Sequence, residues 1–405
     1  MHSSINEKGS RARPHVPLLR LFSMLMVISL LLFPAGAFAA PEQAPSNAAL
    51  APRVVFFSSD GMRPDLMEKY AADGAMPTYA ALMAAGVRGD NGMVQGFPPN
   101  TGVGWYTMAT GTYPGEHGSI NNTYHRSGEG TFNNRTSFSG LGTLQADTLA
   151  AAAERAGKKV AQIEWVGGVN ANSGNVFNGS GSNPSIAGPT VDFANFFSTR
   201  GVLAAPLNAT EQAGAAAFGI SYQTAGFAPA SGWTNVPASS LPAMETTLTV
   251  ATTFAAQNPT RTYNVYAYAA GSTYDHVLLV RSAALKDGSQ ASVNLAVGDF
   301  KEVKLRGADG LIGTRAGQTA GFYVKLMSLA PDLTSFKLYF TSVERIIATC
   351  STAACTALPG GSLENYLADN LPTAVSADFA PLEARIIDED TYVQQGRDLE
   401  AAYSD

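Results

Sequence analysis

The stretch RVVFFSSDGMRPD, residues 53–65, indicates the fold class. Its first half is a continuous apolar segment, which is the pattern of a parallel strand buried on both faces. Pro64 stands where a helix can begin, because proline is favoured in the first helical turn. A strand that leads directly into a helix is typical of an α/β domain with a mostly parallel sheet.

The following segments continue this alternation of helices and strands. Pro77 and Gly86 bound a predicted helix, since proline suits the first turn and glycine suits the carboxyl end. Another helix is expected after FPPN, residues 97–100, and one more in LQADTLAAAAERAG, residues 144–157. The apolar run VAQIEWV, residues 160–166, predicts a further strand.

The character of the sequence changes after Trp165. Residues 167–185, GGVNANSGNVFNGSGSNPS, are rich in Gly, Asn and Ser, which indicates a loop or a boundary. The segments beyond it are rich in strand-forming residues with partial alternation, and they predict a β-rich insertion: TYNVYAYAA, HVLLVRSA, GFYVKLMSL and SFKLYFTSV. Helical patterning returns with SLENYLADNL, residues 362–371, and VQQGRDLEAAYSD ends the chain.

The amino end has the features of an export signal. Three arginines precede the apolar run 21–33, and an A-x-A motif that ends at Ala39 follows it. We expect cleavage after Ala39 and a secreted, periplasmic or cell-surface protein. The alternative is a retained membrane anchor, since residues 21–40 are long enough to span a bilayer.

Composition narrows the class of protein. The chain has 405 residues, of which 45% are hydrophobic and 14% charged, so it can bury a large core in two or more structural units. The net charge is -6, and no Lys/Arg-rich run follows the signal region, so we expect no nucleic-acid polymer as a partner. Cys350 and Cys355 are too few for a metal site, but an oxidising compartment would allow them to form a disulfide.

Two residues occupy positions where an α/β domain binds ligands. Asp60 follows the first predicted strand, and ligands bind at the carboxyl ends of parallel strands. The pair Asp60-Gly61 is also an ordinary turn, which is the simpler reading of this pair alone. Thr101 stands at a predicted helix amino terminus, where the helix dipole favours an alkoxide and an anionic phosphoryl group. The alternative is that Asn100 or Thr101 merely caps this helix.

Together these motifs resemble the type I phosphodiesterase/nucleotide pyrophosphatase family of the alkaline phosphatase superfamily. The resemblance rests on VVFFSSDGMRPD, FPPNT, and TGTYPGEHG with the NN that follows, in this order over residues 53–125. Gly104 and Trp105 replace an Asn-His pair of many members, a departure that we expect to concern substrate preference. Gly102 and Gly104 are expected to loosen the first helical turn or to admit a ligand close to the backbone.

The resemblance implies an alkaline phosphatase-like fold with a three-layer, mostly parallel sheet, incomplete in this chain, and with a β-rich insertion. It implies that Asp60 is a metal ligand and that Thr101 is both nucleophile and metal ligand. Asn122 matches an asparagine that binds a phosphate oxygen, with Asn121 as the alternative register. The implied cofactors are two divalent metal ions, with zinc as the expected ion. The implied reaction is hydrolysis of a small phosphate-ester or nucleotide substrate through a phospho-threonine.

The family also requires an Asp-x-x-x-His set, an Asp-His pair and another His. The pair Asp275-His276 is rejected as a ligand pair, because it precedes an apolar segment instead of following a buried strand. His117 and His125 follow the nucleophile helix and are expected to be structural. Since no histidine follows His276, we expect an amino-terminal fragment whose remaining ligands lie beyond Asp405.

These predictions divide the chain into five segments. Residues 1–39 are the signal peptide and 40–52 a spacer. Residues 53–166 are the first part of the catalytic domain, 167–345 the insertion, and 346–405 a truncated return to the catalytic domain. The predicted function is that of an exported metal-dependent phosphodiesterase or nucleotide pyrophosphatase. A phosphomonoesterase is the nearest alternative. Another is a non-catalytic derivative that uses the insertion to bind a partner or a surface glycan.

Overall fold

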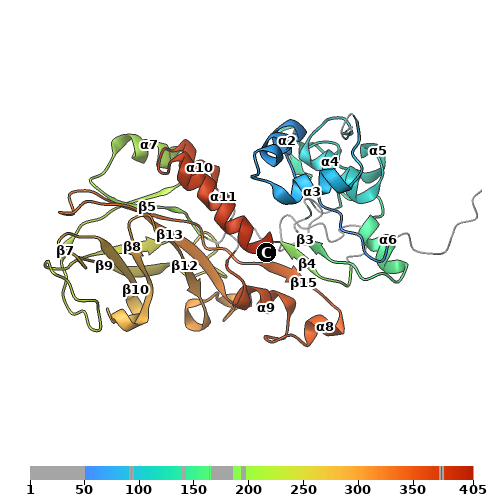
Figure 1. Cartoon of the computed structure of the whole chain (residues 1–405). Coiled ribbons are helices and arrows are strands. Elements are labelled where there is room, and N and C mark those ends of the chain that lie inside the picture. Colours follow the sequence, from blue (N-terminus) through green and yellow to red (C-terminus); the bar gives the residue numbers. More distant parts are fainter. Residues whose placement is uncertain are drawn as a thin grey trace, which may run out of the picture. The chain divides into compact units, whose positions relative to one another are not determined.

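The computed structural model describes residues 51–404 except 91–92, 94, 139, 141, 164, 166–185, 193–197, 374 and 376–377. The chain divides into two compact units, residues 1–70 and 71–405. The described part is a mixed α/β structure with several sheets (Figure 1). The predicted signal peptide and the Gly/Asn/Ser-rich stretch lie outside the described residues. The predicted boundaries after residues 166 and 345 remain predictions.

The apolar segment before Asp60 is extended but forms no strand. Val54, Val55 and Phe57 are 85%, 91% and 83% exposed, so this structure does not show the predicted buried strand. A strand forms only where a neighbour pairs with its backbone N–H and C=O groups, and the described residues of the first unit contain no strand that could pair with this segment. The helix predicted to begin at Pro64 is present as α2, Pro64–Ala72.

The helices predicted in the first part of the second unit are also present. They are α3 (Pro77–Ala85), α4 (Thr101–Thr110) and α6 (Leu149–Arg155), with the short α5 (Pro114–His117) between the last two. Gly86 follows α3 as predicted, and a Cβ at this position would lie 2.8 Å from the carbonyl oxygen of Leu82. A two-stranded ribbon joins α5 to α6 and consists of β1 (Thr123–Tyr124) and β2 (Thr136–Ser137).

A three-stranded sheet contains the strand predicted in VAQIEWV. It consists of β3 (Gln162–Ile163), β4 (Thr190–Asp192) and β15 (Ile347–Thr349), in the order β15-β4-β3. The β3–β4 pair is parallel, whereas β15 and β4 are antiparallel. Helix α9 (Leu363–Asn370) packs against this sheet, and α8 (Ala353–Thr356) precedes it. Cys350 and Cys355 form a disulfide after β15, as the sequence allowed.

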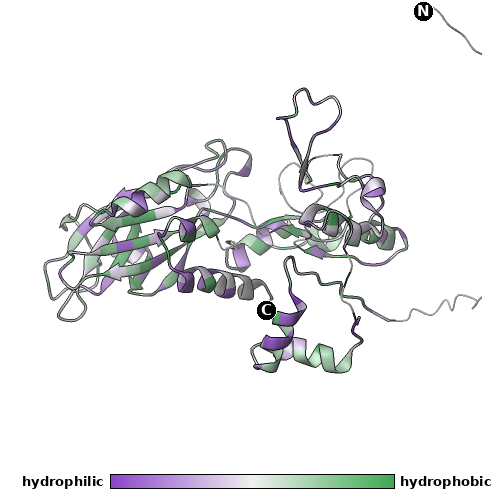
Figure 2. Cartoon of the chain, turned by 90° about the horizontal axis from the view of Figure 1, so that it is seen from above, coloured by the Kyte–Doolittle hydropathy of each residue, from purple (hydrophilic) through white to green (hydrophobic). Residues whose placement is uncertain are grey.

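The β-rich region is a sandwich of two five-stranded sheets. One sheet has the order β11-β10-β9-β8-β7, and the other has the order β12-β13-β14-β5-β6. Their strands are β5 (Gly201–Ala205), β6 (Ser221–Thr224), β7 (Ala228–Pro229), β8 (Met244–Val250), β9 (Arg261–Tyr268), β10 (His276–Arg281), β11 (Ala291–Ala296), β12 (Phe300–Leu305), β13 (Ala320–Leu329) and β14 (Phe336–Phe340). Hydrophobic residues gather in these strands (Figure 2).

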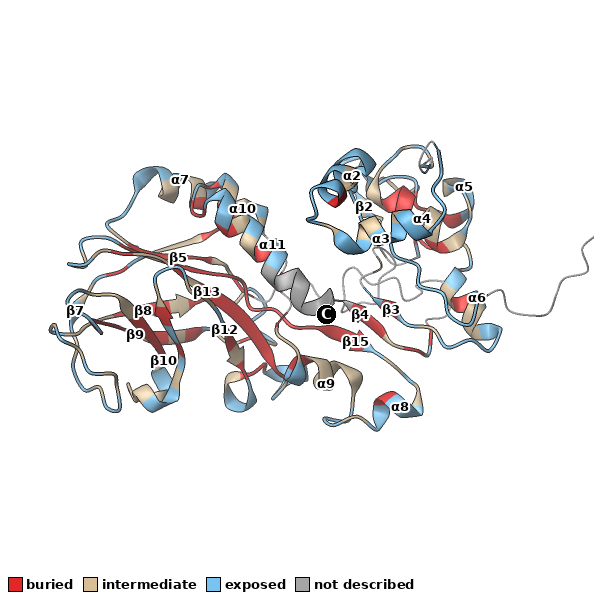
Figure 3. Ribbon diagram, viewed as in Figure 1, coloured by how far each residue is buried: buried red, intermediate tan, exposed pale blue. Residues whose placement is uncertain are grey.

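The interior of the sandwich follows the alternation seen in the sequence. Phe322, Val324 and Leu326 on β13 are fully buried and belong to the core cluster between the sheets. Phe336 and Leu338 on β14 join the same cluster. Alternate residues of a strand point to one face, so these positions face the opposing sheet. Figure 3 shows the buried residues along these strands.

Helices cover the other face of the second sheet. Helix α7 (Ala209–Ala217) connects β5 to β6, and α10 (Phe379–Glu383) and α11 (Glu389–Ser404) end the chain. A second buried cluster joins Val202 and Tyr339 of the sheet to Ala215 of α7 and Ile386. None of the helices in the described part is long and apolar enough to cross a membrane.

The fold class is therefore confirmed as mixed α/β. Among the described strands only β3–β4 and β5–β6 are parallel pairs. This topology does not confirm the expected three-layer, mostly parallel sheet.

Candidate active site at the amino terminus of helix α4

Asn100 determines how α4 begins. Its backbone is extended, and its side-chain Oδ1 accepts a hydrogen bond of 3.2 Å from the N–H of Val103. This is the geometry of an N-cap, which satisfies one of the N–H groups that the first helical turn leaves without a partner. Of the two residues that the sequence offered as caps, Asn100 therefore has this role. Thr101 is the first residue of the helix and is partly buried.

Asn122, which follows α5 in the sequence, contacts the same end of α4. Its Oδ1 accepts a hydrogen bond of 2.7 Å from the backbone N–H of Gly102. This bond places the side chain of Asn122 beside the residue that follows Thr101. Both predicted catalytic residues, Thr101 and Asn122, are thus neighbours in space, although 20 residues separate Gly102 from Asn122 in the sequence.

Asn121 supports this arrangement without contacting the helix backbone. Its Oδ1 accepts hydrogen bonds from Asn100 Nδ2 at 2.7 Å and from the backbone N–H of Asn122 at 2.8 Å. The sequence suggested Asn121 only as an alternative to Asn122. The structure shows three linked asparagines, and this network was missed because its hydrogen bonds join positions that are distant in the sequence.

The base of the β1–β2 ribbon is attached to the same place. The carbonyl oxygen of Asn122 accepts a hydrogen bond of 2.9 Å from the N–H of Phe138. The hydroxyl of Tyr106 donates a hydrogen bond of 2.7 Å to the carbonyl oxygen of Phe138. Because Tyr106 is fully buried in α4, this bond fixes the ribbon to the helix.

Gly102 and Gly104 do not loosen the helix. Both are buried in the first turn of α4, so the expectation of a loosened turn was wrong, and the close approach of a ligand to the backbone stays a prediction. A Cβ on Gly102 would lie 2.7 Å from the Cβ of Phe138, so glycine is needed for close packing at this position. A Cβ on Gly104 would meet only the side chain of Gln95, at the ordinary distance of 3.7 Å.

Trp105 is a core residue. It is 7% exposed, and its ring packs edge-on against Trp165 with 4.9 Å between the centroids. The departure from the family pattern at Gly104 and Trp105 therefore changes the packing around α4, and its effect on substrate preference stays a prediction.

His117 is structural, as predicted. It is fully buried, and its Nδ1 accepts a hydrogen bond of 3.1 Å from the N–H of Ser119. Its Nε2 therefore carries the proton and donates to Thr107 Oγ1 at 3.1 Å. Burial lowers the pKa of His117 to about 4, so the ring is neutral at pH 7. Gly118 follows with a positive φ of 86°, and a Cβ there would clash with the carbonyl oxygen of Thr143.

Asp60 lies in the first unit, in a turn with Gly61, and its side chain is exposed. Thr101 lies in the second unit. The approach of Asp60 to Thr101 and their binding of a common metal therefore remain predictions.

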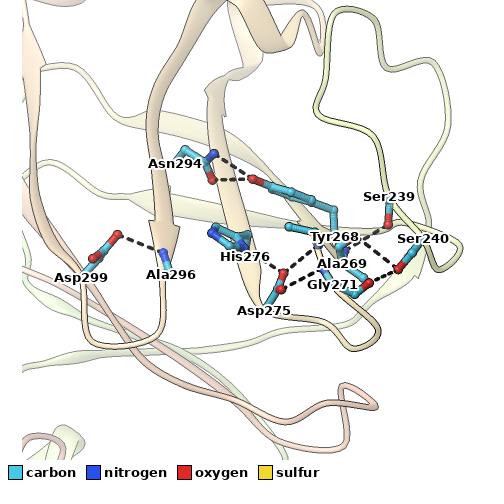
Figure 4. Close-up of polar contacts among 11 residues, drawn as sticks. Ser239, Ser240, Tyr268, Ala269, Gly271, Asp275, His276, Asn294, Ala296 and Asp299 are labelled. Atoms are coloured by element: carbon cyan, nitrogen blue, oxygen red, sulfur yellow. Dashed lines mark hydrogen bonds and ion pairs between the residues drawn. The ribbon is translucent and has the colours of Figure 1, made fainter.

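The pair Asp275-His276 has a local structural role (Figure 4). The carboxylate of Asp275 accepts hydrogen bonds from the N–H groups of Ala270 at 2.8 Å and Gly271 at 3.1 Å. It also contacts His276 Nδ1 at 2.7 Å, and the His276 ring stacks on Tyr268 with 5.3 Å between the centroids. These contacts stabilise the turn between β9 and β10. Within the described ranges, no group of three His, Cys, Asp or Glu side chains is placed to hold a metal ion.

Comparison with known families agrees with these motifs. Residues 54–225 match the model of the family described as type I phosphodiesterase / nucleotide pyrophosphatase. The matched region contains Asp60, Thr101 and Asn122 and continues through β5, α7 and β6. No curated protein and no solved structure matches the chain. Residues 54–225 thus support the resemblance of this region to the type I phosphodiesterase / nucleotide pyrophosphatase family, a family of phosphoester hydrolases.

Proposed function

We propose that the protein is an exported, metal-dependent phosphodiesterase or nucleotide pyrophosphatase that acts through a phosphorylated Thr101. The observation that carries the proposal is the 2.7 Å hydrogen bond from Gly102 N–H to Asn122 Oδ1, which holds Asn122 beside the proposed nucleophile. The disulfide between Cys350 and Cys355 supports an oxidising compartment, in agreement with the predicted export signal.

In the proposed first step, Thr101 Oγ attacks the phosphorus of a small phosphoric ester. A bond forms between Oγ and phosphorus, and the ester oxygen leaves with the electron pair of the broken P–O bond and takes up the proton that the Thr101 hydroxyl loses. Water then hydrolyses the phospho-threonine, which releases the phosphoryl product and restores the hydroxyl. The positive end of the α4 dipole favours both the developing alkoxide and the negative phosphoryl group.

Asn122 is proposed to bind a phosphoryl oxygen through its side-chain Nδ2. Its Oδ1 already accepts a hydrogen bond from Gly102, so the orientation of the amide group is fixed. In the described part of the chain Nδ2 of Asn122 donates no hydrogen bond, which leaves it available for substrate. The N–H groups of Gly102 and Val103 are occupied by asparagine side chains, so Nδ2 is the better candidate for this contact.

The family is metal-dependent, so the proposal includes two divalent metal ions, and zinc is the expected ion. Asp60 and Thr101 are the proposed ligands in this chain. Such ions lower the pKa of a bound hydroxyl and offset phosphoryl charge. A catalytic zinc usually has three protein ligands, and the described residues do not group three ligand side chains. The described residues do not form a metal site on their own.

The proposal is tested by replacing Thr101 and assaying a chromogenic phosphodiester and a phosphomonoester with zinc. Thr101→Ala should abolish turnover, whereas Thr101→Ser should retain part of it because a hydroxyl remains. Thr110→Ala, at the other end of α4, is the matched control and should keep the activity. Full activity of the Thr101→Ala protein would refute the nucleophile, and a preference for the monoester would favour the phosphomonoesterase alternative.

A further inference from the structure

A buried polar cluster lies inside the β-sandwich, and the proposed phosphoesterase reaction does not use it. It is formed by Arg261 and Tyr263 of β9, Arg281 at the end of β10, and Asp309. Tyr263 and Arg281 are directly opposite each other in the antiparallel β9–β10 pair. Residues opposite each other point to the same face of a sheet, and Tyr263 belongs to the core between the two sheets. The side chain of Arg281 is therefore directed toward the same interior.

Arg261 is fully paired and forms the base of the cluster. It is 1% exposed, and it donates hydrogen bonds to the carbonyl oxygens of Pro259 at 2.9 Å, Asp309 at 3.1 Å and Gly310 at 3.0 Å. It also donates to the side chain of Asn258. These contacts attach the segment around Asp309 to β9.

Arg281 and Tyr263 have donors without partners. Arg281 Nη2 forms an ion pair with Asp309 Oδ1 at 2.9 Å, but its Nε and Nη1 are buried and make no hydrogen bond. The hydroxyl of Tyr263 is also buried, and its oxygen interacts with Arg281, which is itself a donor, so the described residues offer its O–H no acceptor. Burial raises the pKa of Tyr263 to about 12, so this hydroxyl keeps its proton at pH 7. Buried donors are nearly always paired in folded proteins, so a group of them in one place calls for an acceptor.

The charges of the cluster indicate which acceptor fits. Burial lowers the pKa of Arg261 to about 10, so Arg261 remains protonated at neutral pH. Arg261 and Arg281 carry two positive charges, and Asp309 is the one carboxylate of the cluster, which leaves one positive charge in excess. A water molecule would satisfy the donors but would leave this charge uncompensated. A monovalent anion satisfies both requirements.

We propose that a small inorganic monoanion of the size of chloride binds beside the guanidinium of Arg281 and the hydroxyl of Tyr263, as the acceptor of their remaining N–H and O–H groups. The ion accepts hydrogen bonds from the N–H groups at Nε and Nη1 and from the Tyr263 O–H. The side chain of Arg281 is 19% exposed, which gives the ion a route from solvent. Because the unfolded chain lacks this site, bound anion stabilises the folded sandwich by mass action.

The test is thermal unfolding of the whole chain in sodium chloride and in sodium gluconate at equal ionic strength. The melting temperature should rise with chloride and not with the larger gluconate ion. Tyr263→Phe removes a single hydroxyl and should weaken the chloride dependence, and Arg281→Met should abolish it. Arg155→Met is the matched control, because Arg155 is an exposed arginine that also pairs with an aspartate, Asp147. It should leave the chloride dependence unchanged.

A crystal of the protein soaked in bromide should show an anomalous peak within hydrogen-bonding distance of Arg281. Equal stabilisation by chloride and gluconate would overturn the proposal. An unchanged chloride dependence of the melting temperature in Tyr263→Phe would also overturn it. Tyr263→Phe keeps the aromatic ring, so it is the decisive variant if Arg281→Met does not fold. A water molecule in place of bromide would overturn it as well.

Discussion

The backbone N–H of Gly102 lies 2.7 Å from Oδ1 of Asn122 and donates a hydrogen bond to it. Asn100 makes the corresponding bond to the next amide, Val103 N–H. Two asparagines thus satisfy two consecutive amides in the first turn of α4. Both side chains contact the turn that begins with Thr101, so the local structure of the helix start and the proposed chemistry depend on the same contacts.

Asn122→Asp separates these two roles. The aspartate keeps an oxygen that can accept from Gly102 N–H, so the thermal stability should change little. It loses the amide donor and adds a negative charge near the phosphoryl group, and removal of one such donor typically lowers the rate about 10²–10³-fold. The measurements are the rate of phosphodiester turnover and the melting temperature of the variant and of the unchanged protein. Loss of activity in Asn121→Asp but not in Asn122→Asp would show that the register is off by one.

Gly102→Ala should destabilise the protein by about 1–3 kcal/mol, as overpacking in a core does. The reason is the 2.7 Å that would separate the new Cβ from Phe138. Gly104→Ala is the control in the same turn, because its Cβ would meet only an ordinary contact of 3.7 Å. Alanine is favoured over glycine in a helix by up to about 1 kcal/mol, so Gly104→Ala should be neutral or stabilising. Urea unfolding gives the free energy of unfolding of both variants. Equal changes in Gly102→Ala and Gly104→Ala would contradict the packing argument.

His117 should make the stability dependent on pH below neutrality. Burial lowers its folded-state pKa from 6.5 to about 4, so between these values the unfolded state binds more protons than the folded state. The stabilisation from the neutral ring is complete above about pH 6.5 and decreases as the pH falls toward 4. The difference amounts to about 3 kcal/mol over this range. Unfolding free energies from pH 4 to 7 should show this slope, and His117→Gln should reduce it whereas His125→Gln should not. An identical slope in His117→Gln would contradict the assignment.

The sequence by itself determined the features that depend on neighbouring residues. Pro77 and Asn100 begin helices because the preference for proline and asparagine in the first turn acts within a few residues. The alternation of Phe322, Val324 and Leu326 predicted a half-buried strand, since the side-chain period of a strand is a local property. The family motifs are also local, and the comparison of residues 54–225 agrees with them.

Only the tertiary structure decided which distant groups meet. The apolar residues 54–57 read as a buried strand, but a strand needs a paired neighbour, and the described residues of the first unit contain none. The close approach of Phe138 explains the glycine at 102, and a hydrogen bond across 20 residues brings Asn122 to the start of α4. Hydrogen bonds and close packing depend on distances in space, and residues far apart in the sequence acquire such distances only when the chain folds.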